Sequence, residues 1–282
     1  MGGIIVIEFT KMHGTGNDFI IIDDRKQTIK NYNELSEKMC KRHFGVGADG
    51  LIVVKKSISY DIKMLIYNAD GSQAPMCGNG IRCFTKYVID NNILNKKNFI
   101  VETLAGPINV KITNNKNNIA FVEVNMGKPV FKGEGIPITD SNGFINQEIV
   151  INNNKYNVST VIVGNVHTIV FVDNIENINI NKIGNEIETH SLYSLNTNVN
   201  FCEIVDSENI KVITWERGVG KTLACGTGAS ASAFISDYLY NMEDNINVHL
   251  LGGTVEISLE EEYIYMRGPA ETIFKGNYYN LN

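Results

Sequence analysis

The chain has 282 residues, of which 43% are hydrophobic and 20% are charged. This balance is typical of a globular chain that buries a core, and it excludes disordered and membrane-embedded chains. The 25 basic and 31 acidic residues give a net charge of −6, and no Lys/Arg stripe is present that would neutralise phosphates, so we expect no nucleic-acid partner. The first apolar run ends at Glu8, too early for a signal peptide or spanning helix. We therefore expect no membrane association and a cytoplasmic location.

Short apolar runs rich in β-formers alternate with a few segments of helical length. In chain order, we predict a helix over 33–44, a strand over 62–67, a helix over 81–92, a helix over 183–190, a strand over 210–215 and a helix over 229–241. Many further short strands are predicted around them. The helices over 81–92 and 229–241 carry apolar or small residues on nearly every side, which is typical of helices buried in the middle of a domain.

The chain contains an internal repeat. Segment 62–81 aligns without a gap on segment 210–229, an offset of 148 residues. Five positions are then identical in the two copies: Ile62, Lys63, Cys77, Gly78 and Gly80. The same offset brings Tyr67 onto Trp215, so the repeat indicates two homologous halves.

The fold that we predict is α+β. It has two pseudo-symmetric β-rich domains, each wrapped around a central helix, with the active site in the cleft between them. We expect one domain over 1–128, rejoined by the C-terminal tail 272–282, and the other over 129–271.

Five cysteines, an odd number, lie at wide spacing with no C-x-x-C pair, which argues against a disulfide framework and a structural zinc site. Three of them, Cys40, Cys83 and Cys202, have apolar neighbours and are expected in the core. The other two, Cys77 and Cys225, each precede a Gly-x-Gly turn that opens a predicted helix.

A thiol at a helix N-terminus is close to the positive end of the helix dipole, which lowers its pKa and allows it to act as a base. The backbone N–H groups that follow form a site for a carboxylate. Two such thiols, one from each half, are what inversion at a carbon requires, because one removes a proton while the other delivers one to the opposite face. N–H donors at the carboxylate would stabilise the developing charge.

The segments around these turns resemble the diaminopimelate epimerase family. The resemblance is carried by KMHGTGNDFIIID (11–23), RHFGVGADGLIVV (42–54), YNADGSQAPMCGNGIRCF (67–84), VNMGKP (124–129), GNVH (164–167), NVNF (198–201), WERGVGKTLACGTGAS (215–230), LLGGTVEI (250–257) and YMRGPA (265–270). It implies a cofactor-independent isomerase of lysine and cell-wall precursor synthesis that interconverts LL- and meso-diaminopimelate, binds no metal, and works as a homodimer.

The resemblance also implies roles for individual residues. Cys77 and Cys225 would be the two bases, while Gly78, Asn79, Gly226 and Thr227 would donate amides to the substrate α-carboxylate. The residues that would hold the substrate are Asn17, Asn68, Asn165, Asn198, Glu216 and Arg217. His167 and Glu216 would accept a thiol proton. Two departures from the family pattern, Val166 for Pro in GNPH and Gly50 for a Gln found in some members, bear on substrate choice and leave the acid/base pair intact.

Rival interpretations are weaker. GVGADG (45–50) fits a dinucleotide motif, but it follows a predicted helix and precedes a strand, which is the wrong order. A pyridoxal lysine would leave the duplicated cysteines unexplained. A related racemase acting on lanthionine, histidine, lysine or hydroxyproline is the nearest alternative, and Arg217 favours a substrate with a second carboxylate. A non-catalytic amino acid binding protein is a further alternative, which the presence of both cysteines disfavours.

Overall fold

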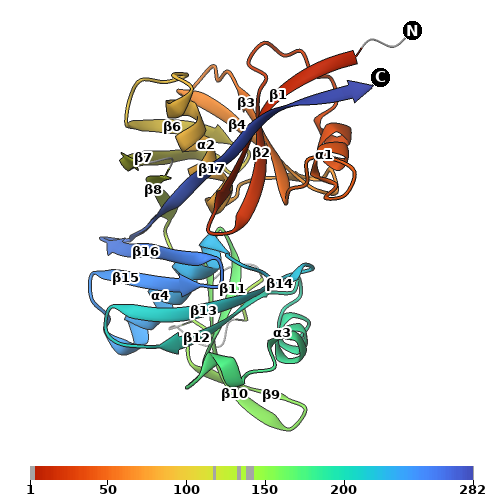
Figure 1. Ribbon diagram of the computed structural model, residues 1–282. Helices are drawn as coiled ribbons and strands as arrows, with labels where there is room; N and C mark the ends of the chain where they lie inside the picture. Colours follow the sequence, from red (N-terminus) through yellow and green to blue (C-terminus); the bar gives the residue numbers. More distant parts are fainter. Residues whose placement is uncertain (1–3, 117–118, 132–134, 138–142, 282) are drawn as a thin grey trace. The chain divides into compact units, whose positions relative to one another are not determined.

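The computed structural model describes residues 4–116, 119–131, 135–137 and 143–281. The chain divides into two compact units (Figure 1). Unit 1 comprises Met1–Val124 and Gly268–Asn282, and unit 2 comprises Asn125–Arg267. The boundary between the two units therefore lies a few residues before the predicted boundary at 128/129. The C-terminal segment belongs to unit 1 from Gly268 onward.

In its described residues, unit 1 is β-rich and has two α-helices. Its elements are β1 (Ile4–Gly14), β2 (Asn17–Asp23), α1 (Tyr32–Cys40), β3 (Gly50–Lys55), β4 (Ile62–Asn68), β5 (Gln73–Ala74), α2 (Gly78–Asp90), β6 (Asn98–Thr103), β7 (Gly106–Lys116), the first part of β8 (Ile119–Gly127) and the second part of β17 (Tyr263–Leu281). Strands β2 and β3 are parallel, as are β4 and β6, whereas β1 pairs antiparallel with both β2 and β17. α2 packs against several of these strands, including β1, β2 and β7, as the central helix of the unit.

Unit 2 repeats this arrangement. Its elements are β9 (Gln147–Ile151), β10 (Asn154–Val163), β11 (Asn165–Phe171), the 3₁₀ helix η1 (Ile175–Asn177), α3 (Ile180–Glu188), β12 (Asn198–Ile204), β13 (Asn209–Glu216), β14 (Gly220–Lys221), α4 (Gly226–Tyr240), β15 (Asn245–Leu250), β16 (Gly253–Glu260) and the first part of β17. β11 and β12 are parallel, as are β13 and β15. α4 contacts β10, β11 and β12 and is the central helix of this unit.

The strand registers of the two units match at the offset of 148 residues. Phe19 pairs with Gly50 in unit 1, and His167 pairs with Asn198 in unit 2. Leu51 pairs with Tyr67, and Val199 pairs with Trp215 in the same way. The predicted repeat and the predicted α+β fold of two β-rich halves are confirmed.

The predicted helices are present, with different ends. α2 and α4 begin at Gly78 and Gly226, three residues before the predicted starts, because Cys77 and Cys225 are themselves the N-cap residues. α1 ends at Cys40 instead of 44, since Lys41 is already extended and Gly45 folds back onto the helix end. A Cβ at Gly45 would lie 2.2 Å from the carbonyl oxygen of Lys38.

Each unit has its own hydrophobic core. In unit 1, Ile20, Leu35, Met39 and Leu51 belong to a buried cluster between α1 and the sheet. The corresponding cluster of unit 2 contains Ile187, Val199 and Phe201, among others.

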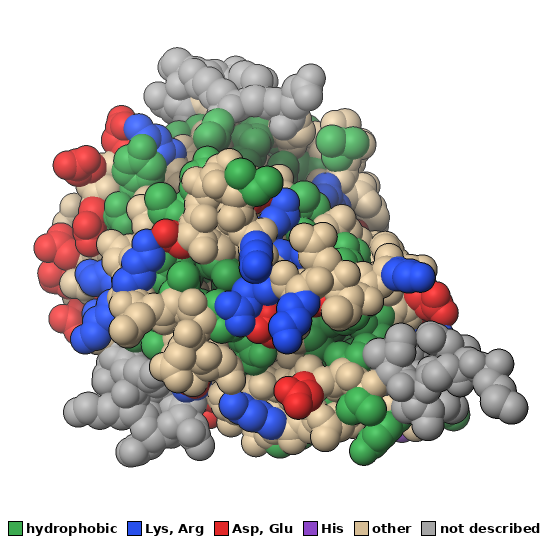
Figure 2. Space-filling model, turned by 90° about the horizontal axis from the view of Figure 1, so that it is seen from above, with side chains coloured by type: hydrophobic (Ala, Val, Ile, Leu, Met, Phe, Trp, Pro, Cys, Tyr) green, Lys and Arg blue, Asp and Glu red, His purple; other side chains and the backbone are tan. Residues whose placement is uncertain are grey.

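No helix in the described part of the chain is long and apolar enough to cross a membrane. On the face shown in Figure 2, hydrophobic side chains lie among charged side chains of both signs.

Gly184 of α3 is a position where packing overrides helix propensity. An added Cβ would lie 2.7 Å from Cγ of Trp215. Although alanine in a helix interior is about 1 kcal/mol better than glycine, overpacking of this kind costs about 1–3 kcal/mol. We expect Gly184→Ala to lower the free energy of unfolding by about 1 kcal/mol in urea denaturation. The neighbouring exposed change Asn185→Ala is the control and should not lower it; a Gly184→Ala variant as stable as the wild type would contradict this packing.

Candidate active site

The first thiol of interest caps a helix in unit 1. Cys77 is the N-cap residue of α2 and has extended backbone angles, so the N–H groups of the first turn follow directly after it. Its Sγ donates to Oδ1 of Asn17 at 3.6 Å, and Nδ2 of Asn79 donates to the same oxygen at 3.3 Å. Three of the predicted site residues are therefore in contact.

Asn17 is held in this orientation by a carboxylate. Its Nδ2 donates to Oδ2 of Asp49 at 2.7 Å, and Arg42 in turn contacts the other carboxylate oxygen of Asp49 at 2.7 Å. Because an ionised carboxylate only accepts hydrogen bonds, the amide nitrogen must face Asp49 and the amide oxygen must face Cys77. Asp49 was missed in the sequence because it lies in the rejected glycine motif 45–50.

Asn68 lies at the end of β4, exposed, where its Nδ2 donates to Oγ of Ser72 at 2.9 Å. It pairs across the sheet with Gly50. A Cβ at Gly50 would lie 2.8 Å from the carbonyl oxygen of Tyr67, so this chain has no room for a side chain at that position without a backbone shift.

The second thiol has the equivalent position in unit 2. Cys225 is the N-cap residue of α4, and its Sγ accepts from the backbone N–H of Gly228 at 3.4 Å. Oγ1 of Thr227 lies 3.4 Å from the same sulfur. A thiol that accepts a helix N–H is placed to carry negative charge.

His167 contacts this group through Thr227. Its Nε2 lies 2.9 Å from Oγ1 of Thr227, and its Nδ1 lies 3.1 Å from Nδ2 of Asn200. That amide nitrogen also donates to the carbonyl of Thr168, so Nδ1 of His167 accepts and Nε2 carries the proton. Burial, with a smaller contribution from the charge of Arg217, lowers the pKa of His167 to about 3, so the imidazole is neutral at neutral pH.

The polar residues at the ends of β11, β12 and β13 meet. Nδ2 of Asn198 donates to the carbonyl of Val166 at 2.9 Å, and its Oδ1 accepts from the backbone N–H of Arg217 at 3.0 Å. Nη1 of Arg217 donates to the carbonyl of Leu195, and Oε1 of Glu216 accepts from Oγ1 of Thr222, both at 2.7 Å. Asn165 is exposed and follows Gly164 in a turn. This turn lies against Thr227, because a Cβ added at Gly164 would be 3.4 Å from Cγ2 of Thr227.

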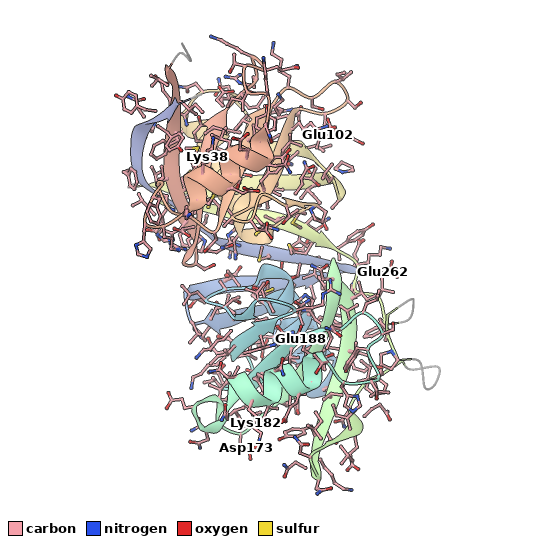
Figure 3. All side chains as sticks on the ribbon, turned by 90° about the vertical axis from the view of Figure 1, so that its right-hand side faces the viewer. Lys38, Glu102, Asp173, Lys182, Glu188 and Glu262 are labelled. Atoms are coloured by element: carbon pink, nitrogen blue, oxygen red, sulfur yellow. The ribbon has the colours of Figure 1, made fainter. Side chains whose placement is uncertain are left out.

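Glu188 holds the turn that carries Glu216 and Arg217. This buried carboxylate of α3 accepts from Nε1 of Trp215 at 2.7 Å and from the backbone N–H of Gly218 at 2.9 Å (Figure 3). It therefore holds the side chain of Trp215 before the two predicted residues and the backbone of Gly218 after them. Sequence reasoning gave no signal for Glu188, because the offset of 148 places it on the apolar Cys40.

The other cysteines are buried as predicted. Cys40, Cys83 and Cys202 are at most 2% exposed. Burial raises the pKa of Cys83 and of Cys202 to about 12, so both stay neutral thiols. Within the described residues, no three His, Cys, Asp or Glu side chains form a group that could hold a metal ion.

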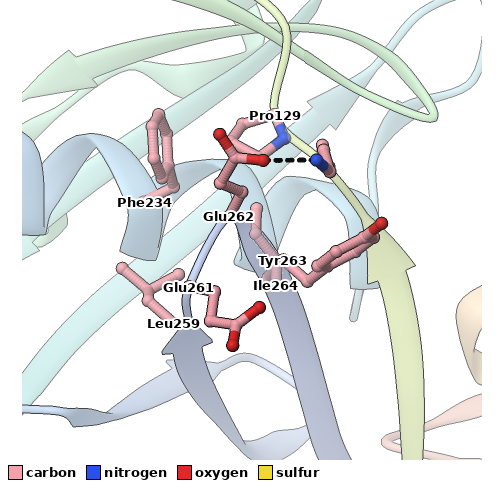
Figure 4. A pocket seen from close by; sticks show the side chains of 8 residues that line it. Pro129, Phe234, Leu259, Glu261, Glu262, Tyr263 and Ile264 are labelled. Atoms are coloured by element: carbon pink, nitrogen blue, oxygen red, sulfur yellow. Dashed lines mark hydrogen bonds and ion pairs between the residues drawn. The ribbon is translucent and has the colours of Figure 1, made fainter.

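A pocket of about 300 Å³ lies in unit 2 at the hairpin of β16 and β17 (Figure 4). It is lined by Lys128, Pro129, Phe234, Leu259, Glu261, Glu262, Tyr263 and Ile264, and Lys128 forms an ion pair with Glu262 at its rim. None of the predicted site residues lines it.

Comparison with solved structures supports the fold. A hydroxyproline epimerase of Agrobacterium vitis superposes with a TM-score of 0.74 at 12% identity, covering 100% of this chain and 95% of that one. A phenazine biosynthesis protein of the PhzF family from Bacillus anthracis gives 0.71 at 17% identity, covering 97% and 99%. At these identities the likeness concerns the fold alone.

Comparison of sequences goes further. A family model described as diaminopimelate epimerase matches residues 9–132 and 159–273. The chain is 45% identical to a diaminopimelate epimerase of Alkaliphilus metalliredigens, covering 97% of this chain and 98% of that protein. It is 47% identical to another from Caldanaerobacter subterraneus, covering 96% and 98%. The chain therefore belongs to the diaminopimelate epimerase family of isomerases.

Proposed function

We propose that this protein interconverts LL- and meso-diaminopimelate by moving the proton at one α-carbon, with Cys77 and Cys225 as the two acid/base groups. The observation that carries the proposal is that each thiol caps a buried helix at the same register of a duplicated unit. A structural cysteine would not need an N-terminal turn with open N–H groups after it. The two halves have kept this arrangement while most other side chains changed.

In the proposed reaction, a thiolate takes the α-proton, and the electron pair of the C–H bond stays on the carbon and its carboxylate. The other thiol then delivers its proton to the opposite face, so the thiolate and thiol exchange roles. The backbone N–H groups at Gly78, Asn79, Gly226 and Thr227 would stabilise the carboxylate as its charge grows. Only proton transfers are needed, and no cofactor enters the sequence of steps.

The side chains that we assign to substrate binding are amides and charged groups. They are Asn17, Asn68, Asn165, Asn198, Glu216 and Arg217. Amides donate and accept, which suits an amino acid zwitterion. The guanidinium of Arg217 offers a planar fork for the distal carboxylate, and this is the feature that favours diaminopimelate over amino acids with a single carboxylate.

We assign His167 an orienting role at Cys225. Its neutral imidazole donates to Thr227, which leaves the hydroxyl proton of Thr227 available to the sulfur. Glu216 remains a candidate acceptor of a thiol proton and is anchored by Thr222.

The proposal is tested by deuterium exchange. The purified protein, stripped of metal and pyridoxal phosphate, should introduce deuterium at the α-carbon of LL- and meso-diaminopimelate in heavy water. We expect Cys77→Ala and Cys225→Ala each to reduce epimerisation by about 10²–10⁴-fold, because each loses one acid/base group. Activity that disappears on stripping and returns with a metal or pyridoxal phosphate would contradict the proposal, as would an Ala variant with wild-type rate.

The assignment of one thiol to each face has a sharper test. A substrate analogue with a leaving group on the β-carbon eliminates after proton removal alone, with no proton delivery. Cys77→Ser and Cys225→Ser should then each eliminate from one stereoisomer only, the one whose α-proton faces the remaining thiol. Equal elimination of both stereoisomers by both variants would exclude two separate bases.

The buried neutral state of His167 has a consequence for stability. Its native pKa is about 3, below the ordinary 6.5, so between these values the unfolded chain binds one more proton than the folded chain. The free energy of unfolding should therefore fall by about 1.4 kcal/mol for each pH unit below 6.5 on account of this residue. In urea unfolding between pH 7.5 and 5, His167→Gln should lack this one-proton slope, whereas the exposed His249→Gln should keep it. Parallel profiles for wild type and His167→Gln would show that the imidazole is not held neutral.

We further propose that the protein is a cytoplasmic homodimer without a nucleic-acid partner. The family resemblance implies the dimer, and the ribbon of β1 and β17 carries exposed apolar side chains that support it. Val6 and Tyr279 pair across these strands, and Ile273 lies further along β17. Tyr279 is 64% exposed.

We expect Tyr279→Glu to shift the sedimentation mass from the dimer toward a monomer of 31.4 kDa, since it places a charge in the apolar contact. Tyr238→Glu, a comparably exposed tyrosine of unit 2, is the matched control and should leave the mass unchanged. A dimer that persists at micromolar concentration in Tyr279→Glu would place the interface elsewhere.

A further inference from the structure

The second glycine of the Gly-x-Gly turn after Cys225 makes room for two polar side chains. A Cβ at this glycine, Gly228, would overlap with Oδ1 of Asn200 and lie 3.0 Å from Oγ1 of Thr214. Asn200 and Thr214 pair across β12 and β13, and both are buried. Polar groups buried in this way find their hydrogen-bond partners inside the protein.

At the same place, unit 1 has apolar side chains. The offset of 148 residues places Ile52 at Asn200 and Ile66 at Thr214. Both isoleucines lie against Gly80, since a Cβ added there would be 3.2 Å from Cδ1 of each. Because a pair of isoleucines fills this space in unit 1, packing alone does not explain the amide and the hydroxyl in unit 2.

The amide of Asn200 has one orientation that satisfies its neighbours. The hydroxyl of Thr214 donates to its Oδ1 at 2.9 Å. Its Nδ2 lies 3.4 Å from the carbonyl oxygen of Thr168 and 3.1 Å from Nδ1 of His167, and it has one hydrogen for each. The reversed amide would place Oδ1 against the carbonyl of Thr168, where two acceptors repel each other. Nδ1 of His167 therefore accepts a hydrogen bond from Asn200.

This bond decides which nitrogen of His167 carries the ring proton. Burial and the charge of Arg217 lower the pKa of His167, so the ring has a single proton at neutral pH. Because Nδ1 accepts from Asn200, the proton is on Nε2, which lies 2.9 Å from Oγ1 of Thr227. The imidazole thus donates to the hydroxyl of Thr227 and does not accept from it.

The direction of this second bond matters for the thiol of Cys225. Oγ1 of Thr227 lies 3.4 Å from Sγ of Cys225, and either atom can be the donor. A thiolate only accepts, so it needs the hydroxyl hydrogen, whereas a thiol can donate to the oxygen. If Nδ1 of His167 carried the proton, the hydroxyl would donate to Nε2 and could serve the thiol alone. With the proton on Nε2, Thr227 can serve both states. This contrast holds whatever else contacts Cys225, because it concerns the hydroxyl of Thr227.

We propose that Asn200, oriented by Thr214, is a positioning residue that keeps the ring proton of His167 on Nε2, so that Thr227 can stabilise Cys225 as a thiol and as a thiolate. The position of the ring proton does not depend on any reaction. Its catalytic value rests on the proposed function, in which Cys225 alternates between these two states.

The position of the ring proton can be measured in the wild-type protein. In the full-length protein labelled with ¹⁵N-histidine, protonated and unprotonated ring nitrogens give separate NMR signals at neutral pH. The signals of His167 are those that are absent from His167→Gln. We expect a protonated Nε2 and an unprotonated Nδ1. A protonated Nδ1, alone or together with Nε2, would overturn the proposal without any change at Asn200.

Asn200→Asp reverses the hydrogen-bond pattern with little change in shape. A carboxylate only accepts, and a buried aspartate at Nδ1 holds the opposite tautomer, as in the catalytic triads of serine proteases. Nδ1 of His167 should therefore gain a proton. With diaminopimelate as substrate, kcat should fall by about 10-fold or more while KM stays within about twofold, because the substrate contacts are kept. An unprotonated Nδ1 or an unchanged kcat in this variant would overturn the proposal.

A matched pair of variants separates the network from the packing of unit 2. Thr214→Val and Thr160→Val each replace a buried hydroxyl by a methyl group, but Thr214 bonds to Asn200 and Thr160 to the hydroxyl of Tyr193. Thr214→Val removes the donor that orients the amide, so part of the His167 population should carry its proton on Nδ1. Thr160→Val should leave the spectrum of His167 unchanged. The same spectrum in both variants would overturn the proposal, even if Asn200→Asp does not fold. Deuterium exchange reports separately on the proposed function, because its failure would leave the NMR signals unaffected.

Discussion

The N-terminal turn of a buried helix leaves backbone N–H groups without partners, and the site in each unit depends on this constraint. Cys77 and Cys225 cap such turns, and glycine follows each of them, so a ligand can approach the backbone closely. Burial of the helix among strands fixes the direction of these N–H groups. Under the proposed function, the same feature would bind the substrate carboxylate and favour a thiolate.

Around these turns, hydrogen bonds from neighbouring side chains fix the orientation of the amide and imidazole groups, which the backbone alone would not determine. Asp49 orients Asn17, and Asn200 orients His167. Glu188 of α3 holds the indole of Trp215 before Glu216 and Arg217, and the backbone N–H of Gly218 after them. These supporting side chains are mostly buried, so their hydrogen bonds are protected from competition with water. Residues expected to bind substrate thereby begin in defined positions, which reduces the entropy that binding must overcome.

The repeat made much of the fold predictable from the sequence. Identity at Cys77, Gly78 and Gly80 across an offset of 148 residues indicated the duplicated units and placed both thiols close to helix N-termini, although the predicted helices began three residues too late. Supporting residues were harder to find because their partners are distant in the chain and their types differ between halves. Glu188 aligns with Cys40, and Arg82 aligns with Ser230. Periodicity also placed the helix ends poorly, since Gly45 ends α1 through a tertiary contact with its backbone.

The divergence of the two units follows from the chemistry that both would serve. A symmetric pair of thiols would have equal tendencies to lose a proton, and two thiolates or two thiols cannot perform inversion. The proposed reaction therefore needs one proton shared between the two groups. The two units have equivalent helix N-termini, but different side chains lie around them, among them Arg82 in unit 1 and the neutral imidazole of His167 in unit 2. The shared backbone geometry places both thiols at helix N-termini, which suits two groups that exchange the roles of acid and base in the proposed reaction.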